Sequence, residues 1–189
     1  MKIIALAFAG LLAMASLATT AHAAEDDYLT IQLKDGPVVV QLLPDVAPKT
    51  VERVKELAKK GAYDNVAFHR VIEGFMAQTG DVEFGNMKNG YDAKRAGTGG
   101  SDMGDLPAEF SSVPFERGTL GMARAQDPNS GNSQFFIMFA DGSFLNGQYT
   151  VFGKVISGME YVDKIKRGEG GNGEVTDPDR MIKVTVGRK

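Results

Sequence analysis

The sequence predicts a mainly β fold, a closed eight-stranded antiparallel barrel with two capping α-helices. Three observations point to this fold. Apolar and polar residues alternate over several short runs, the pattern of strands with one buried face. Only two stretches show helical spacing instead. The 189 residues include 23 glycines and show no internal repeat, which suits one domain with many tight turns.

The chain divides into a leader and one folded domain. Residues 1–23 have a positive start, an almost purely apolar stretch over 3–18 and, within 19–23, small residues at the two positions that precede a cleavage point after Ala23, the form of a cleavable signal peptide. A retained anchor is the alternative, but the apolar run is short for a membrane span. We therefore expect residues 24–189 to be exported, periplasmic in a bacterium with two membranes, and without stable membrane association. There is no cysteine, so packing alone must stabilise the domain.

The domain is expected to begin with a hairpin and a helix. Leu29–Leu33 and Val38–Leu42 alternate in polarity and are joined by Asp35-Gly36, the strongest short-range signal of a β-hairpin. Pro48 suits the first residue of a helix whose apolar residues recur at helical spacing until Gly61.

Strand patterns return after this helix. The expected strands are Val66–Ile72, Phe75–Gln78, Thr119–Ala123, Gln134–Phe139, Thr150–Ile156 and Arg180–Val186. A second helix is expected over Met159–Lys166, ended by Gly168. A long connection rich in glycine and aspartate, without periodicity, runs from Phe84 to Val113. Such a loop in a compact domain is usually functional or disordered.

Composition argues against several classes of function. The formal net charge is −3 and no basic block is present, so nucleic acid is not an expected partner. His69 is the single histidine after the leader, so catalytic triads and His/Cys metal sites lack their residues. Gly97–Gly100 lacks a Walker lysine and dinucleotide-binding spacing. No carboxylate pair for glycoside hydrolysis can be placed. We expect neither a metal nor another cofactor.

Three segments place large apolar residues beside polar ones. Strand alternation over 134–139 sends Phe135, Ile137 and Phe139 to one face, typical of a core, and Gln134, Phe136 and Met138 to the other. The second set indicates a partly exposed apolar patch. Segments 68–72 and 74–78 add Arg70 and Gln78 among apolar neighbours. Taken singly, such residues are more often surface arginines and core aromatics.

Taken together, the segments resemble the cyclophilin-type peptidyl-prolyl cis–trans isomerases. Phe68–Gln78 is similar to the family's signature segment. Ser133–Ile137, and Phe144–Gly147 through Val151–Val155, are similar to its second and third motifs, in the family's order. Pro48-Lys49-Thr50 and Gly97–Gly100 also match. The resemblance spans nearly all of 24–189 and is greatest to exported bacterial members. It implies a cyclophilin-like barrel with its groove on the outer surface, and rotation of X-Pro bonds without a cofactor.

The resemblance also implies roles for individual residues. Arg70 would be the catalytic arginine, and Gln78 would hold the peptide backbone or orient Arg70. The implied catalytic set is Arg70, Phe75, Gln78 and Phe136. The implied substrate-binding set is Met76, Gly97, Ala123, Arg124, Ala125, Gln134, Phe144, Leu145 and Tyr149.

Five positions depart from the family pattern. Glu73 and Thr79 stand where proline and glycine are common, beside the pocket, so we expect little effect on mechanism. Phe144 takes the place of a tryptophan found in many eukaryotic members, and Tyr149 that of a histidine. Loss of the indole N–H removes a donor, so cyclosporin binding should be weak. Arg124 replaces a usual asparagine and should favour acidic residues near the substrate proline.

The expected partners are proline-containing unfolded or exported polypeptides, whose folding a monomeric isomerase would assist. One alternative is a peptide-binding, chaperone-like module that uses the same groove with little turnover. The presence of Arg70 argues against it. Another is a sugar- or peptide-cleaving barrel enzyme, which needs acid–base residues that the pattern does not supply.

Overall fold

A computed structural model describes residues 27–187. The predicted signal peptide lies outside the described residues. The elements in chain order are β1 (Tyr28–Gln32), β2 (Pro37–Leu42), α1 (Pro48–Lys59), β3 (Arg70–Ile72), β4 (Met76–Thr79), β5 (Thr119–Met122), β6 (Phe135–Met138), the 3-10 helix η1 (Ser143–Leu145), β7 (Val151–Ser157), α2 (Met159–Val162) and β8 (Lys183–Gly187). The mainly β prediction with two α-helices is confirmed.

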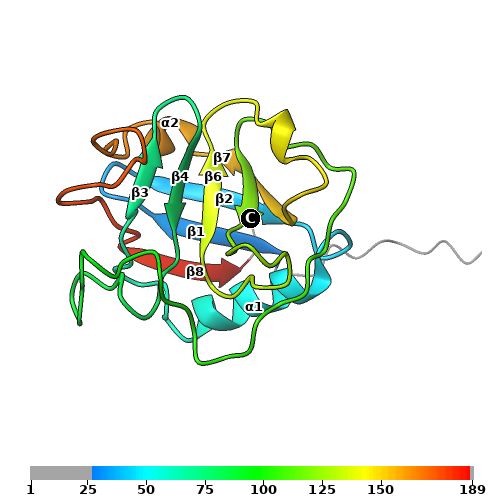
Figure 1. Cartoon of the computed structure of the whole chain (residues 1–189), viewed down its shortest axis with the longest axis horizontal. Coiled ribbons are helices and arrows are strands. Elements are labelled where there is room, and N and C mark those ends of the chain that lie inside the picture. The colour runs from blue at the N-terminus through cyan, green and yellow to red at the C-terminus, as the bar shows by residue number, and fades with distance from the viewer. Residues whose placement is uncertain (1–26, 188–189) are drawn as a thin grey trace, which may run out of the picture.

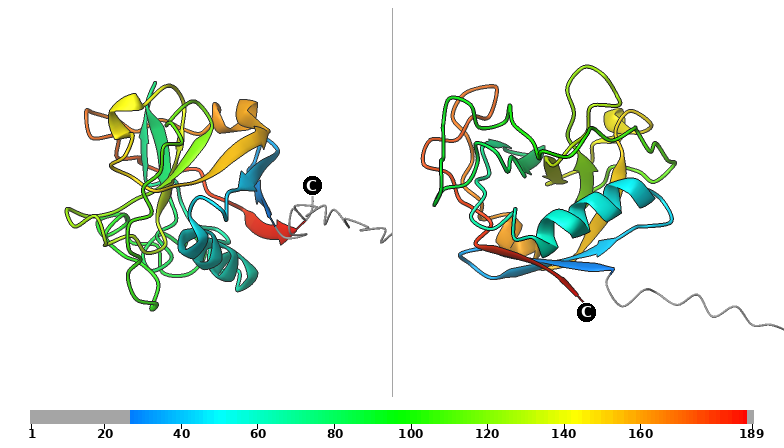
Figure 2. Two further views of the ribbon diagram at one scale, coloured as in Figure 1. Left: turned by 90° about the vertical axis from the view of Figure 1, so that its right-hand side faces the viewer. Right: turned by 90° about the horizontal axis from the view of Figure 1, so that it is seen from below.

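All eight strands form one curled sheet, in the order β3-β4-β6-β5-β7-β2-β1-β8 (Figures 1 and 2). Every strand pair is antiparallel. The predicted hairpin is present, with Gln32 opposite Pro37 and the turn closed by a 3.0 Å hydrogen bond from Leu33 N to Gly36 O.

The predicted closure of the barrel is wrong. β3 and β8 are the two edges of an open, curled half-barrel, and no ladder joins them in the described part of the chain. Only isolated contacts span the gap, such as the bridge between Ala67 and Arg180. Residues 168–179, which approach β3, contain four glycines and Pro178, and these residue types disfavour regular strands. β3 is confined to Arg70–Ile72 instead of the expected Val66–Ile72, because its ladder with β4 ends at the pair Arg70–Gln78 and Val66 and Ala67 make only isolated bridges.

In Figure 1 α1 lies at the bottom of the molecule, in contact with β8, and α2 lies at the top, in contact with β2. α1 begins at Pro48 as predicted, and Gly61 ends it in the left-handed region at φ 70°, a conformation that suits glycine. α2 stops at Val162 instead of Lys166, because the following turn closes with i→i+3 bonds such as Ile165 N to Val162 O. Within residues 27–187 no helix is long and apolar enough to cross a membrane.

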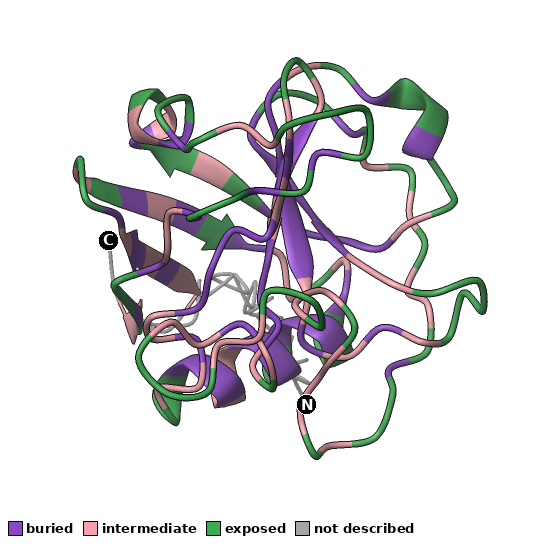
Figure 3. Cartoon of the chain, turned by 60° about the vertical axis from the view of Figure 1, so that its left-hand side comes forward, coloured by how far each residue is buried: buried purple, intermediate pink, exposed green. Residues whose placement is uncertain are grey.

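Every residue of the central strands β5 and β6 is buried, on both faces of the sheet (Figure 3). Phe135, Ile137 and Phe139 lie in the main core, as the alternation predicts. Phe136 and Met138 lie on the other face, in a second cluster with Met76, Phe115, Leu145 and Val151. The predicted exposure of this face is wrong for Phe136 and Met138, which are 5% and 0% exposed. The segments around Phe115 and Leu145 cover them.

Candidate active site

Strand register places the central site residues in one row. Arg70 on β3 lies opposite Gln78 on β4, which lies opposite Phe136 on β6. Gly121 on β5 continues the row opposite Phe136. Side chains that are directly opposite in neighbouring strands lie on the same face of a sheet. The row therefore runs from a guanidinium, through an amide, to an aromatic ring on the outer face.

All the site residues predicted from the sequence line one of two adjoining pockets. The first, of about 310 Å³, is lined by Arg70, Phe75, Met76, Gln78, Ala123, Arg124, Phe136, Phe144, Leu145 and Tyr149. The second, of about 240 Å³, includes Gly97, Ala125 and Gln134. It shares Gln78, Ala123 and Arg124 with the first. The structure thus brings the predicted residues together, while their roles remain predictions.

Packed aromatic rings form the first pocket. Phe136 stacks on Phe115 with ring centroids 5.7 Å apart and meets the edge of Tyr149 at 5.8 Å. On the rim, Phe144 lies 5.5 Å from Phe75 and is 63% exposed. The result is an apolar slot with a buried floor and an exposed aromatic rim.

Arg70 forms the polar wall of this slot. Its Nε donates to the backbone oxygen of Asn172 at 2.9 Å, and its Nη1 donates to Gln78 Oε1 at 3.3 Å. Nη1 also lies 4.0 Å from Met76 Sδ. No residue between 27 and 187 bonds Nη2. Two N–H groups of a half-buried guanidinium are therefore free to bond a ligand.

A chain of amides fixes the orientation of Gln78. Gln78 Nε2 donates to Gln134 Oε1 at 3.1 Å, and Gln134 Nε2 donates to the Gly99 carbonyl at 2.8 Å. Since a carbonyl can only accept, Gly99 requires the Gln134 amide to present its nitrogen, and each amide then sets the next. Gln78 consequently presents its oxygen to Arg70.

His69, beside Arg70 in the sequence, is buried beneath the segment Gly97–Gly100, here called the glycine loop. A Cβ at Gly97 would lie only 2.9 Å from the His69 ring. Burial lowers the pKa of His69 to about 4, so the ring is neutral at neutral pH. Its two nitrogens have no hydrogen-bond partner among the described residues. These features suit a packing role.

Arg124 braces the wall between the two pockets. Its guanidinium lies 4.5 Å from the centre of the Tyr149 ring. Its terminal nitrogens donate to the backbone oxygens of Ala125, Gln126 and Gln148 at 2.9, 3.3 and 3.1 Å. Beyond the charge noted from the sequence, Arg124 therefore ties two loops together.

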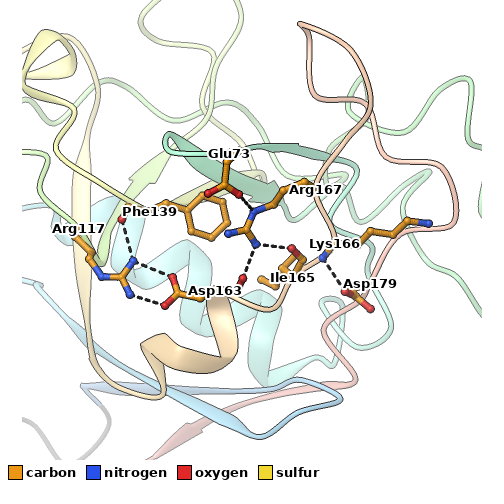
Figure 4. Close-up of polar contacts among 8 residues, drawn as sticks. All are labelled: Glu73, Arg117, Phe139, Asp163, Ile165, Lys166, Arg167 and Asp179. Atoms are coloured by element: carbon orange, nitrogen blue, oxygen red, sulfur yellow. Dashed lines mark hydrogen bonds and ion pairs between the residues drawn. The ribbon is translucent and has the colours of Figure 1, made fainter.

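The turn before Phe75 is anchored to the segment that follows α2 (Figure 4). Glu73 accepts a hydrogen bond from Arg167 Nε, and Arg167 Nη1 donates to two backbone oxygens, those of Asp163 and Ile165. The Arg167 guanidinium also lies 4.2 Å from the centre of the Phe139 ring. The sequence predicts only that Glu73 has little effect on mechanism. The structure gives its side chain a partner, Arg167, 94 residues away.

Further supporting residues were missed from the sequence. Gly121 is required because a Cβ there would lie 2.4 Å from Phe136 and 2.6 Å from Phe115. Asn172 holds Arg70 through its backbone, so its side chain gives no signal. Only the strand register, had it been known, would have revealed Gly121.

Sequence comparisons identify relatives over almost the whole domain. The family model "Cyclophilin type peptidyl-prolyl cis-trans isomerase/CLD" matches residues 28–186. A Brucella suis protein named "Probable peptidyl-prolyl cis-trans isomerase" is 61% identical over 176 residues, covering 93% of this chain and 90% of that protein. A Dictyostelium discoideum peptidyl-prolyl cis-trans isomerase is 36% identical, covering 84% of this chain and 96% of its own length.

Solved structures show the same fold. The crystal structure of a Cryptosporidium parvum cyclophilin-type isomerase, determined in the presence of the dipeptide Ala-Pro, is 26% identical, with a TM-score of 0.72 and coverage of 86% of this chain and 99% of that one. A Hirschia baltica cyclophilin, 24% identical, also has a TM-score of 0.72 and covers 86% of this chain and 74% of its own. This chain therefore belongs to the cyclophilin-type peptidyl-prolyl cis–trans isomerases.

Proposed function

We propose that this enzyme accelerates X-Pro rotation in exported polypeptides, with Arg70 donating a hydrogen bond to the prolyl nitrogen as the amide twists. The observation that carries the proposal is the shared pocket of Arg70 and Phe136. Arg70 lines this apolar slot, and no residue between 27 and 187 bonds its Nη2.

Rotation about the X-Pro bond breaks no covalent bond, so a hydrogen-bond donor beside an apolar slot can accelerate it. Resonance opposes rotation about a peptide bond with a barrier of roughly 18–20 kcal/mol. In the twisted state the prolyl nitrogen regains a lone pair and can accept a hydrogen bond. A donor aimed at that nitrogen binds the transition state more tightly than the planar ground state. One hydrogen bond from a charged donor contributes about 1.5–3 kcal/mol, or about ten- to a hundredfold in rate.

The apolar slot contributes a second effect. A planar amide is more polar than a twisted one, so transfer from water disfavours the ground state more. Phe75, Met76, Phe136 and Leu145 would hold the pyrrolidine ring. The Ala-Pro dipeptide present with the Cryptosporidium parvum relative supports a prolyl ligand for this pocket.

The second pocket would receive the residues that precede proline. An extended peptide leaving the proline slot passes Ala123 and Arg124, which both pockets share, and reaches Gly97 and Ala125. Cyclosporin would bind weakly, because the Phe144 ring carries no N–H donor.

A protease-coupled assay on a short X-Pro peptide tests the catalytic role. We expect Arg70→Ala to lower kcat/KM at least tenfold while peptide affinity stays within a few-fold. Arg95→Ala is the matched control, because Arg95 lies over the Phe84 ring and lines neither pocket. Equal rates for wild type and Arg70→Ala would refute the assignment. Peptide binding by wild type without turnover would favour the chaperone-like alternative.

Export is proposed from the composition of residues 1–23, and folding assistance to exported clients follows from it. When the full chain is expressed in a Gram-negative host, the periplasmic fraction should contain a protein with the mass of residues 24–189, which begins at Ala24. An uncleaved chain in the cytoplasmic or membrane fraction would contradict export and leave the isomerase chemistry unaffected.

A further inference from the structure

Asp81, two residues beyond the end of β4, is a fully buried carboxylate with four backbone donors. Its exposed fraction is 0%. Oδ1 accepts from the N–H groups of Glu83 and Phe84 at 3.1 and 2.9 Å. Oδ2 accepts from those of Gly97 and Gly99 at 2.7 and 3.0 Å. One side chain therefore joins the end of β4 to the middle of the long glycine-rich connection.

The glycine loop is shaped around this carboxylate. Gly97 has φ +98°, and a Cβ at Gly99 would lie 2.6 Å from Asp81 Oδ1. Glycine is thus required at 97 for the backbone conformation and at 99 for close approach. Successive backbone N–H groups form concave anion sites. The Gly97–Gly100 segment, which lacks the residues of a nucleotide site, encloses an internal anion instead.

This anchor is connected to Arg70 by an unbroken series of hydrogen bonds. Asp81 holds the N–H of Gly99, and the carbonyl of Gly99 accepts from Gln134 Nε2 at 2.8 Å. Gln134 Oε1 accepts from Gln78 Nε2, and Gln78 Oε1 accepts from Arg70 Nη1. The position of the Gly99 carbonyl consequently decides how both amides face.

We infer that Asp81 is a positioning residue of the isomerase, acting through Gly99, Gln134 and Gln78 to orient the Arg70 guanidinium toward the slot. The inference rests on the proposed role of Arg70. Asp81 does not touch the substrate pockets, since it lines neither of them. Its effect on catalysis must therefore pass through the loop.

Asp81→Asn separates the two halves of the anchor with little change of shape. An asparagine oxygen can accept from one pair of N–H groups, but its NH₂ group then faces the other pair, donor against donor. We expect the Gly97–Gly99 pair, which belongs to the long connection, to be released. Arg70 then loses a fixed acceptor, and kcat should fall about tenfold, the low end of the effect of a hydrogen bond to a charged group.

A double-mutant cycle distinguishes positioning from simple destabilisation. Gln134→Leu breaks the same series one step later, so it should also lower kcat about tenfold. If the inference holds, the double variant Asp81→Asn/Gln134→Leu should be no more than about threefold slower than either single variant, because interacting residues are not additive. Losses that multiply to about a hundredfold would overturn it. The Arg70 Nε–H resonance in a ¹⁵N-correlated NMR spectrum should shift in both single variants; an unchanged resonance would count equally against it.

Two controls make the test specific. Asp64→Asn is the matched change at a carboxylate that accepts the N–H of Val184 at 2.9 Å, outside the series; it should lower stability and leave kcat unchanged. If Asp81→Asn does not fold, Gly99→Ala, whose Cβ would press on Asp81, acts on the same link and enters the same cycle. Activity retained in Arg70→Ala would refute the proposed role of Arg70. Activity lost in Arg70→Ala but retained in Asp81→Asn would refute only the role of Asp81.

Discussion

Gly121→Ala should displace Phe136, on the floor of the first pocket, without contacting Arg70. The new Cβ would lie 2.4 and 2.8 Å from two Phe136 atoms and 2.6 Å from a Phe115 atom. Carbon atoms in contact prefer separations of about 3.5–4.0 Å. The Phe136 ring must therefore move by about 1 Å, and its stacking partner Phe115, 0% exposed, leaves little room.

The expected cost follows from this overlap. Overpacking of this kind destabilises by about 1–3 kcal/mol, which lowers Tm by roughly 2–12 °C in a domain of this size. A displacement of about 1 Å in a catalytic site can reduce activity about a hundredfold, so kcat/KM in the protease-coupled assay should fall at least tenfold. Gly104→Ala is the matched control, because within residues 27–187 no atom beyond Gly104 and its two chain neighbours lies within 4 Å of the Cβ position there. A Gly121→Ala protein with wild-type Tm and kcat/KM would refute the packing account of the pocket floor.

Three further predictions concern pH, the β3–β4 turn and specificity. Burial lowers the pKa of His69 to about 4, below the roughly 6.5 of an unfolded histidine. The unfolded chain therefore binds more protons between these two pH values. The free energy of unfolding should be highest above about pH 6.5 and should fall by up to about 3 kcal/mol as the pH drops to 4. In urea titrations at pH 7 and 4.5, His69→Gln should lose less stability on acidification than wild type; an equal loss would contradict this. Arg167→Met should cost about 1–2 kcal/mol by denaturation, because it removes two carbonyl bonds and the contact with Phe139. Glu73→Gln, at a side chain 76% exposed, should cost under about 0.5 kcal/mol, and the reverse ranking would be inconsistent with the contacts described. Wild type should prefer Glu over Lys before proline by about two- to fivefold, and Arg124→Asn should remove the preference; a ratio unchanged by the substitution would exclude Arg124 as its source.

Features encoded locally were predictable from the sequence. Asp35-Gly36 predicted the hairpin, and Pro48 and Gly61 predicted the bounds of α1. Alternation over 134–139 separated the core residues from those on the site face. These signals come from neighbouring residues, so no knowledge of distant contacts was needed.

Features that depend on distant contacts were not predictable. The prediction of a closed barrel was wrong because closure depends on how a glycine-rich segment near the C-terminus pairs with β3. Asn172 supports Arg70 from 102 residues away through a backbone oxygen, and Asp81 meets Gly97 across 16 residues without periodicity. The groove residues themselves were found through family resemblance, since Arg70 or Phe136 alone resembles an ordinary surface or core residue.

The central claim is that Arg70 acts on the twisted amide, and exchange NMR on an X-Pro peptide tests it most directly. At saturating enzyme this measurement gives the on-enzyme rate of isomerisation and the Kd separately. For Arg70→Ala we predict a rate about ten- to a hundredfold lower than wild type and a Kd within a few-fold. A wild-type rate in Arg70→Ala, or a loss of binding that accounts for the whole loss of rate, would contradict the claim.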